Sequence, residues 1–107
     1  LMGGDAVQVS HAAALALKNL LGLACDPVAG LVEVPCVKRN VMGAVNALTS
    51  ADMVMAGITS KIPPDEVIDA MRAIGRSMSE DIRETGKGGL AGTPTGVAIR
   101  ERMAGTL

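Results

Sequence analysis

The sequence predicts a small all-α domain that carries one loop rich in Cys and Pro and a second loop rich in Gly. Three segments place apolar residues at helical spacing, and the chain shows no internal repeat, heptad pattern or alternation of strands with helices. Its 107 residues suffice for one small domain and include no Phe, Tyr or Trp. A core of short aliphatic side chains and Met buries little area per residue. We therefore expect a marginally stable unit that packs against a larger protein.

The first helix is expected over residues 5–21. Asp5 is a suitable N-cap after two glycines, and Gly22 is a natural stop. Polar residues are few in this segment, so we expect the helix to be buried on more than one side. Its apolar positions are Val9, Ala12, Ala13, Ala16, Leu17, Leu20 and Leu21.

The stretch from Leu23 to Cys36 predicts a structured loop. Its two prolines remove backbone donors and disfavour helix at the residues before them. Residues 31–34 form a possible short extended run. A loop this apolar, with a Cys near each end, suggests that it wraps around a ligand.

Further helices are expected after this loop. One runs over about residues 37–56, with Thr49, Ser50 and Asp52 as a possible break. The next opens at Pro64 or Asp65 and weakens at Gly75. Residues 77–83 suggest a short helical turn.

A Gly-rich segment follows. Five glycines between Gly86 and Gly96 disfavour helix there. Thr95 is the predicted cap of a last short helix over residues 96–104.

Charge and hydropathy exclude several classes of function. The net charge of −1 gives no electrostatic basis for binding nucleic acid or an anionic membrane. No segment has the apolar length of a membrane span, and the start lacks the features of a secretory signal. We expect a cytoplasmic protein. Both ends read as cuts in a longer chain, because the chain starts at Leu1 and ends without a recognisable stop.

Cys25 and Cys36 are the main candidates for chemistry. By themselves they are a weak signal, since free cysteines are often small buried hydrophobic residues. A cytoplasmic chain disfavours a disulfide, and zinc would need two more ligands, whereas the single His, His11, lies on a helix. Their surroundings favour a ligand role: neighbouring prolines stiffen the loop, and the helix start with Lys38 and Arg39 favours the thiolate form of Cys36.

Four stretches carry a resemblance to a known family: CDPVAGLVEVPCVKRN, GAVNAL, SKIPPDEVIDAM and RETGKGGLAGTPTG. The chain resembles the iron–sulfur-dependent L-serine dehydratases over essentially its whole length. The resemblance implies that residues 1–107 are the C-terminal part of the alpha (catalytic) domain, expected to be inactive alone. It also implies a cytoplasmic lyase of amino-acid catabolism and gluconeogenesis.

The family binds a 4Fe–4S cluster through three Cys, so the resemblance implies that Cys25 and Cys36 are two of the ligands and that a third lies upstream. One iron without a protein thiolate acts as a Lewis acid on the substrate hydroxyl, and a base removes the alpha proton. The aminoacrylate product gives pyruvate and ammonia. The sequence assigns no base. The implied partners are L-serine, the rest of the alpha domain and the beta (regulatory) domain or subunit, in an oligomer.

Two groups of residues are candidates for binding the substrate. Arg39 and Asn40 are suited to the carboxylate and amino group of serine, because a guanidinium grips a carboxylate through two parallel hydrogen bonds. The alternative for Arg39 is a structural cap or ion pair. The second group lies in or beside the Gly-rich loop, whose backbone N–H groups can approach a ligand. It comprises Arg83, Thr85, Gly86, Gly88 and Gly89.

Two other readings stay open from the residues alone. One is a helical interaction module in which both cysteines are incidental. The other is a redox or zinc protein. A cluster in the intact protein would give a broad brown absorbance, which an interaction module would lack.

Overall fold

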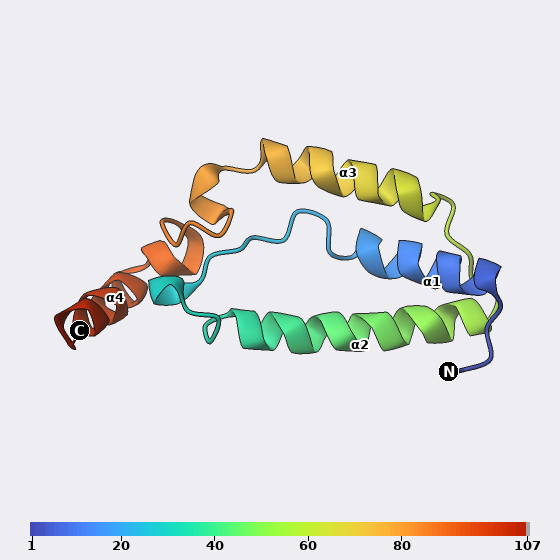
Figure 1. The fold of residues 1–107 in the computed structure, drawn as a ribbon, viewed down its shortest axis with the longest axis horizontal. Helices are drawn as coiled ribbons and strands as arrows, with labels where there is room; N and C mark the ends of the chain where they lie inside the picture. The colour runs from blue at the N-terminus through green and yellow to red at the C-terminus, as the bar shows by residue number, and fades with distance from the viewer. Residues whose placement is uncertain (107) are drawn as a thin grey trace. The chain divides into compact units, whose positions relative to one another are not determined.

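The computed structural model describes residues 1–106, and the prediction of an all-α fold is confirmed over them (Figure 1). The described part contains four α-helices and three short 3-10 helices, and an isolated parallel bridge is its only β-type pairing. The elements in order are α1 (Ala6–Lys18), η1 (Val28–Gly30), α2 (Cys36–Met55), α3 (Pro64–Ser77), η2 (Glu80–Ile82), η3 (Gly89–Gly92) and α4 (Pro94–Thr106).

The chain folds as two compact units that interleave in sequence. Unit 1 comprises Leu1–Gly22 and Met42–Arg76, and unit 2 comprises Leu23–Val41 and the residues from Ser77 onward. Helix α2 therefore gives its first six residues to unit 2 and the rest to unit 1. Both candidate loops belong to unit 2.

Helix α1 begins as the sequence predicts. The Asp5 carboxylate accepts a hydrogen bond from the Gln8 N–H at 2.8 Å, and the Gln8 side chain accepts one from the Asp5 N–H at 2.9 Å. This reciprocal capping box satisfies two donors that a helix start otherwise leaves unpaired. The helix ends at Lys18, three residues before the expected end. The predicted cap is confirmed, and the predicted helix was three residues too long at its C-terminal end.

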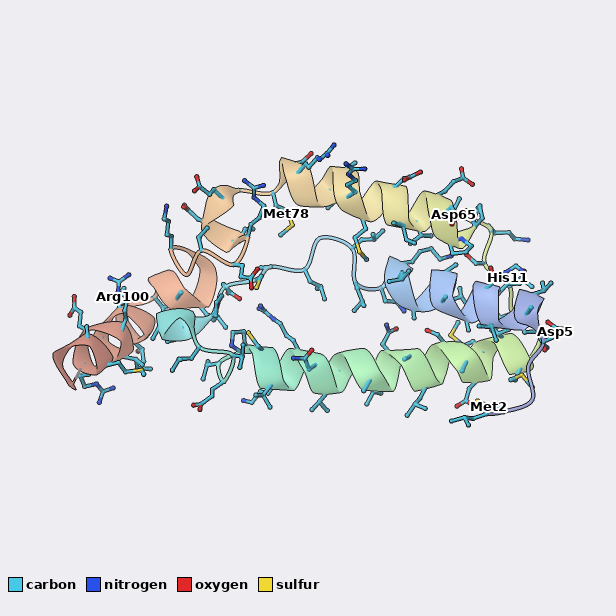
Figure 2. The ribbon with its side chains drawn as sticks, viewed as in Figure 1. Met2, Asp5, His11, Asp65, Met78 and Arg100 are labelled. Atoms are coloured by element: carbon cyan, nitrogen blue, oxygen red, sulfur yellow. The ribbon has the colours of Figure 1, made fainter. Side chains whose placement is uncertain are left out.

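Unit 1 holds α1 against the later part of α2 through polar contacts and small buried side chains. The Asn46 side chain donates to the Ala16 carbonyl at 2.9 Å and accepts from the Asn19 amide at 2.7 Å. The buried apolar side chains of unit 1 are those of Ala14, Val54 and Val67. His11, labelled in Figure 2, accepts a hydrogen bond at 3.1 Å from the Ser60 N–H, so it anchors the linker before α3.

Helix α2 is continuous, so the possible break at residues 49–52 is absent. Ser50, the polar residue at the centre of that region, is 1% exposed and lies on the buried face of the helix. A small hydroxyl can be accommodated on a buried helix face, so the 20-residue helix continues through Ser50 without interruption.

Unit 2 differs from the sequence prediction at three places. The Gly-rich segment, where helix was not expected, contains the short 3-10 helix η3 and the start of α4. Residues 32–35 form a turn where an extended run seemed possible, and the Val34 carbonyl accepts from the Val28 N–H at 2.9 Å. At the start of α4 the cap is Thr93, since its hydroxyl accepts from the Gly96 N–H at 3.1 Å. Pro94 then takes the first helical position, where a missing N–H costs nothing. The prediction of Thr95 as the cap was therefore wrong.

The described residues bury few large side chains. No aliphatic larger than Val is fully buried, and many larger ones are exposed by 40% or more. On the unit 1 part of α2, Met42, Val45 and Leu48 are 66%, 50% and 67% exposed. This agrees with the expectation of a thin core. Within residues 1–106, no helix is both long and apolar enough to cross a membrane.

Candidate functional site

The Cys25 segment is held by its backbone. The Cys25 N–H donates to the Ile82 carbonyl, and the Cys25 carbonyl accepts from the Glu84 N–H, both at 2.8 Å. Glu84 adopts a left-handed backbone conformation, with φ of 72°, which is uncommon for a residue with a side chain. The loop of residues 23–36 and the segment before the Gly-rich loop are thus joined at Cys25.

Asp26 is the most buried charged residue of unit 2, at 3% exposure. One carboxylate oxygen, Oδ2, accepts a hydrogen bond from the Leu90 N–H at 2.7 Å, and the other, Oδ1, pairs with Arg39. Burial acts to raise the pKa of Asp26, but the Leu90 N–H and the Arg39 guanidinium outweigh burial, so the pKa is lowered. The carboxylate is therefore stably charged where it lies.

Arg39 connects the two cysteine segments. It lies one turn after Cys36 in α2, whose first turn is closed by the Arg39 N–H on the Pro35 carbonyl at 3.2 Å. Its Nη1 donates to the Ala24 carbonyl at 2.6 Å and to Asp26. The groups that flank Cys25 are thus bound by a side chain from the helix that carries Cys36. The side chain of Arg39 is 37% exposed.

Both cysteines are free thiols and are partly exposed. Desolvation raises the pKa of the Cys25 thiol, and the negative charges of Glu84, Cys36 and Asp26 add to this, while Arg39 opposes it. Without a metal, these surroundings favour the protonated thiol of Cys25.

Two glycines let the backbone of the Gly-rich loop pack closely against its neighbours, which include Asp26 in the loop of residues 23–36. A Cβ atom added to Gly89 would overlap the Asp26 carboxylate and lie 2.7 Å from its Cβ, and the φ of 59° there also favours glycine. The Gly88 N–H donates to the Asp81 carbonyl at 2.9 Å, and a Cβ at Gly88 would lie 2.8 Å from the Asp81 Cβ. Both glycines are required for close backbone packing.

The other predicted site residues have simpler surroundings. Asn40 and Arg83 are exposed. The Thr85 hydroxyl donates to the Glu80 carbonyl at 2.9 Å, which closes a turn. A substrate role for these residues, and for Arg39, Gly88 and Gly89, stays a prediction.

Asp26 is the functional candidate that sequence reasoning missed. The sequence places this carboxylate beside Cys25 in an apolar loop but does not show which residues it binds. Its partners lie 13 and 64 residues away, so only the fold reveals its role.

The donor set is incomplete within the described residues. No group of three or more His, Cys, Asp or Glu side chains among residues 1–106 is arranged to hold a metal ion. Two Cys thiolates do fit the chemistry of an iron–sulfur cluster, which takes soft sulfur ligands. The two thiols thus fit part of a ligand set.

A sequence profile described as "Serine dehydratase alpha chain" matches residues 1–91. The chain belongs to the serine dehydratase alpha-chain family. The match covers the whole site described above, including both cysteines, Asp26, Arg39 and the Gly-rich loop through Leu90. The resemblance to the serine dehydratases that the sequence suggested is therefore confirmed.

Curated relatives have the same kind of name. A probable L-serine dehydratase alpha chain of Latilactobacillus sakei is 65% identical over 103 residues, which cover 96% of this chain and 49% of the relative. The corresponding protein of Bacillus subtilis is 63% identical, with 96% of this chain and 34% of the relative covered. The L-serine dehydratase alpha chain of Peptoniphilus asaccharolyticus is 53% identical, over 94% of this chain and 34% of its own length. No solved structure matches significantly.

The chain spans about half or less of these relatives. Each of these relatives therefore has as much sequence again, or more, outside the matched part. This agrees with the many large apolar side chains that the described part exposes.

Proposed function

We propose that the chain is the ligand-bearing part of an L-serine dehydratase that uses an iron–sulfur cluster, with Cys25 and Cys36 as two cluster ligands. The observation that carries the proposal is the pair of free thiols in unit 2, whose segments Arg39 joins. An incidental pair of cysteines would have no reason to share such an arrangement. The relatives' names give L-serine as the substrate of a dehydratase, and the family resemblance implies its deamination to pyruvate and ammonia.

A bound 4Fe–4S cluster would supply a Lewis acid for the departing hydroxyl of serine. The residues of this chain are proposed to bind the cluster and to hold its ligands in place. Cys25 and Cys36 give up their protons to bind as thiolates. The bonds of Cys25 to residues 82 and 84 keep its backbone in place while they do so.

Substrate recognition is proposed for the surface beside the thiols. Among the described residues, both contacts of the Arg39 guanidinium use Nη1, so Nη2 and Nε remain to donate to the serine carboxylate. Asn40 is exposed on the next position of α2, where its amide can bind the amino or carboxylate group. Thr85 and the backbone of Gly88 and Gly89 are the remaining candidates.

The third cluster ligand is proposed to come from another part of the alpha chain. Residues 1–107 are proposed to form the C-terminal part of the alpha domain and to be inactive without the remainder. The relatives named as alpha chains support a complex with a beta region, and a cytoplasmic oligomer is the assembly we propose.

The test is an assay of the intact alpha chain together with its beta region. After anaerobic reconstitution with iron and sulfide, we expect a broad brown absorbance and pyruvate formation from L-serine. The unreconstituted protein should be colourless and should form no pyruvate. Equal pyruvate formation in both samples would refute the cluster-dependent reaction.

A further inference from the structure

We propose that Arg39 and Asp26 form a clasp that sets the separation of the two ligand thiols, and that both act as positioning residues. The proposal rests on the proposed function, because it takes Cys25 and Cys36 as cluster ligands. It assigns to Asp26 a role that neither the sequence nor the family name suggests. It also gives Arg39 a positioning role beside the proposed binding of serine.

The geometry gives the clasp two ends. One end is α2, which begins at Cys36 and fixes Arg39 three residues later, on the same side of the first helical turn. The other end is the Cys25 segment, where Nη1 binds the Ala24 carbonyl and the Asp26 carboxylate. One guanidinium nitrogen therefore holds the residues before and after Cys25. Ten residues of loop separate the cysteines, and the clasp adds a direct link between the two ends of this loop.

The second carboxylate oxygen of Asp26 extends the clasp to the Gly-rich loop. It accepts from the Leu90 N–H at 2.7 Å, and the absence of a side chain at Gly89 lets the backbone come this close. Both oxygens of a buried charge are thus satisfied by different segments. Asp26 therefore orients Arg39 and fixes the Gly-rich loop at the same time.

Physical reasoning predicts what loss of the clasp would do. A cluster needs its thiolates at fixed positions, and partners that orient ligands commonly change metal affinity by about 10- to 100-fold when mutated. Without the clasp, the Cys25 segment keeps its backbone hydrogen bonds to residues 82 and 84 but loses the Arg39 contacts that connect it to α2. We therefore expect a cluster that forms and is then lost quickly.

The test uses the intact enzyme with its beta region and three variants: Asp26→Asn, Arg39→Gln and the double variant. After anaerobic reconstitution, iron and sulfide per folded alpha chain are measured, followed by the half-time of cluster loss to a chelator. We expect each single variant to lose the cluster about 10-fold faster or more. The double variant should lose the cluster more slowly than the product of the two single effects, because the Arg39–Asp26 ion pair that both changes break can be lost only once.

The matched control is Glu80→Gln, which removes a carboxylate from the exposed ion pair with Lys87 in the same unit, at 3.6 Å. Its cluster should be lost at the wild-type rate. Cluster loss at the wild-type rate in both Asp26→Asn and Arg39→Gln would overturn the clasp. It would also be overturned if the fold increase in the rate of cluster loss in the double variant equalled the product of the two single increases. If circular dichroism shows that Asp26→Asn does not fold, the test uses Arg39→Gln and Arg39→Lys, which keeps the positive charge. The half-time of cluster loss in these two variants then decides whether the clasp holds.

A Cys25→Ser arm separates the two levels of the argument. If this variant keeps the wild-type cluster content, the proposed ligand role fails and the clasp fails with it. If it loses the cluster while the clasp variants keep theirs, only the clasp fails. If Arg39 only bound substrate, Arg39→Gln would have a higher KM for serine and would lose the cluster at the wild-type rate. Asp26→Asn would then have the wild-type KM and the wild-type rate of cluster loss.

Discussion

At the scale of residues, Arg39 shows what sequence can and cannot predict. Its place one turn after Cys36 suggested a guanidinium that binds a carboxylate, with a structural ion pair as the alternative. The structure gives it a carboxylate, that of Asp26, 13 residues earlier in the chain. The residue type predicts the chemistry of the partner, but its identity depends on how the loop folds back.

Gly89 supplies a prediction at this scale. Gly89→Ala places a Cβ against the Asp26 carboxylate and forces Ala into a left-handed conformation. We expect a loss of about 1–3 kcal/mol in the free energy of unfolding. Urea denaturation followed by circular dichroism measures it.

Gly43 is the matched control for this change. It lies inside α2 with open space around its Cα, so Gly43→Ala should raise stability by up to about 1 kcal/mol. Equal effects of the two substitutions would contradict the close packing of the Gly-rich loop on Asp26.

At the scale of elements, the helices were predicted well and their ends less so. Periodic apolar residues located α1, α2 and α3, and Asp5 correctly marked a start because its capping partner Gln8 is local. The start of α4 was misplaced, since Thr93 and Thr95 both precede helical residues. Only the backbone path decides between them: Thr93 has the hydroxyl that reaches Gly96. The clasp between distant loops was beyond local patterns altogether.

The cap of α4 is directly testable. Thr93→Ala removes the acceptor for the Gly96 N–H, and we expect a loss of about 1 kcal/mol. Thr95→Ala should change stability by less than half of that, since Ala favours the helix interior. Amide hydrogen exchange over residues 94–98 reads out the effect locally. A larger loss from Thr95→Ala would restore the original sequence prediction.

At the scale of the whole molecule, the thin core is the dominant feature. Fully buried side chains are few and small, while Met42, Val45 and Leu48 lie exposed on one stretch of α2. Exposed apolar surface of this kind marks an interaction site or promotes association. The lack of aromatic residues made this predictable from composition, although the residues exposed were not.

We accordingly expect residues 1–107 to associate when produced alone. Sedimentation velocity at high micromolar concentration should show species larger than a monomer. Met42→Lys or Leu48→Lys, on the exposed side of α2, should reduce the association, whereas Lys61→Glu, at an exposed polar position, should not. A clean monomer under these conditions would contradict the expectation.

The same fragment should purify without a cluster. Two thiolates leave the remaining irons unligated, and a cluster so held is open to hydrolysis and oxidation. Iron analysis of aerobically purified fragment should find far less than one iron per chain. Stoichiometric iron would mean that these residues suffice to hold a metal centre.

The measurement that tests the central claim most directly is the cluster content and specific activity of intact Cys25→Ser and Cys36→Ser enzymes. Serine stays protonated near neutral pH and is a poor ligand for an iron–sulfur site. If the two cysteines are ligands, each variant should fold, lose its brown absorbance and form no pyruvate from L-serine. If they are only packing residues, each change should cost about 1–3 kcal/mol of stability, and the folded fraction should keep full cluster content and wild-type activity per molecule.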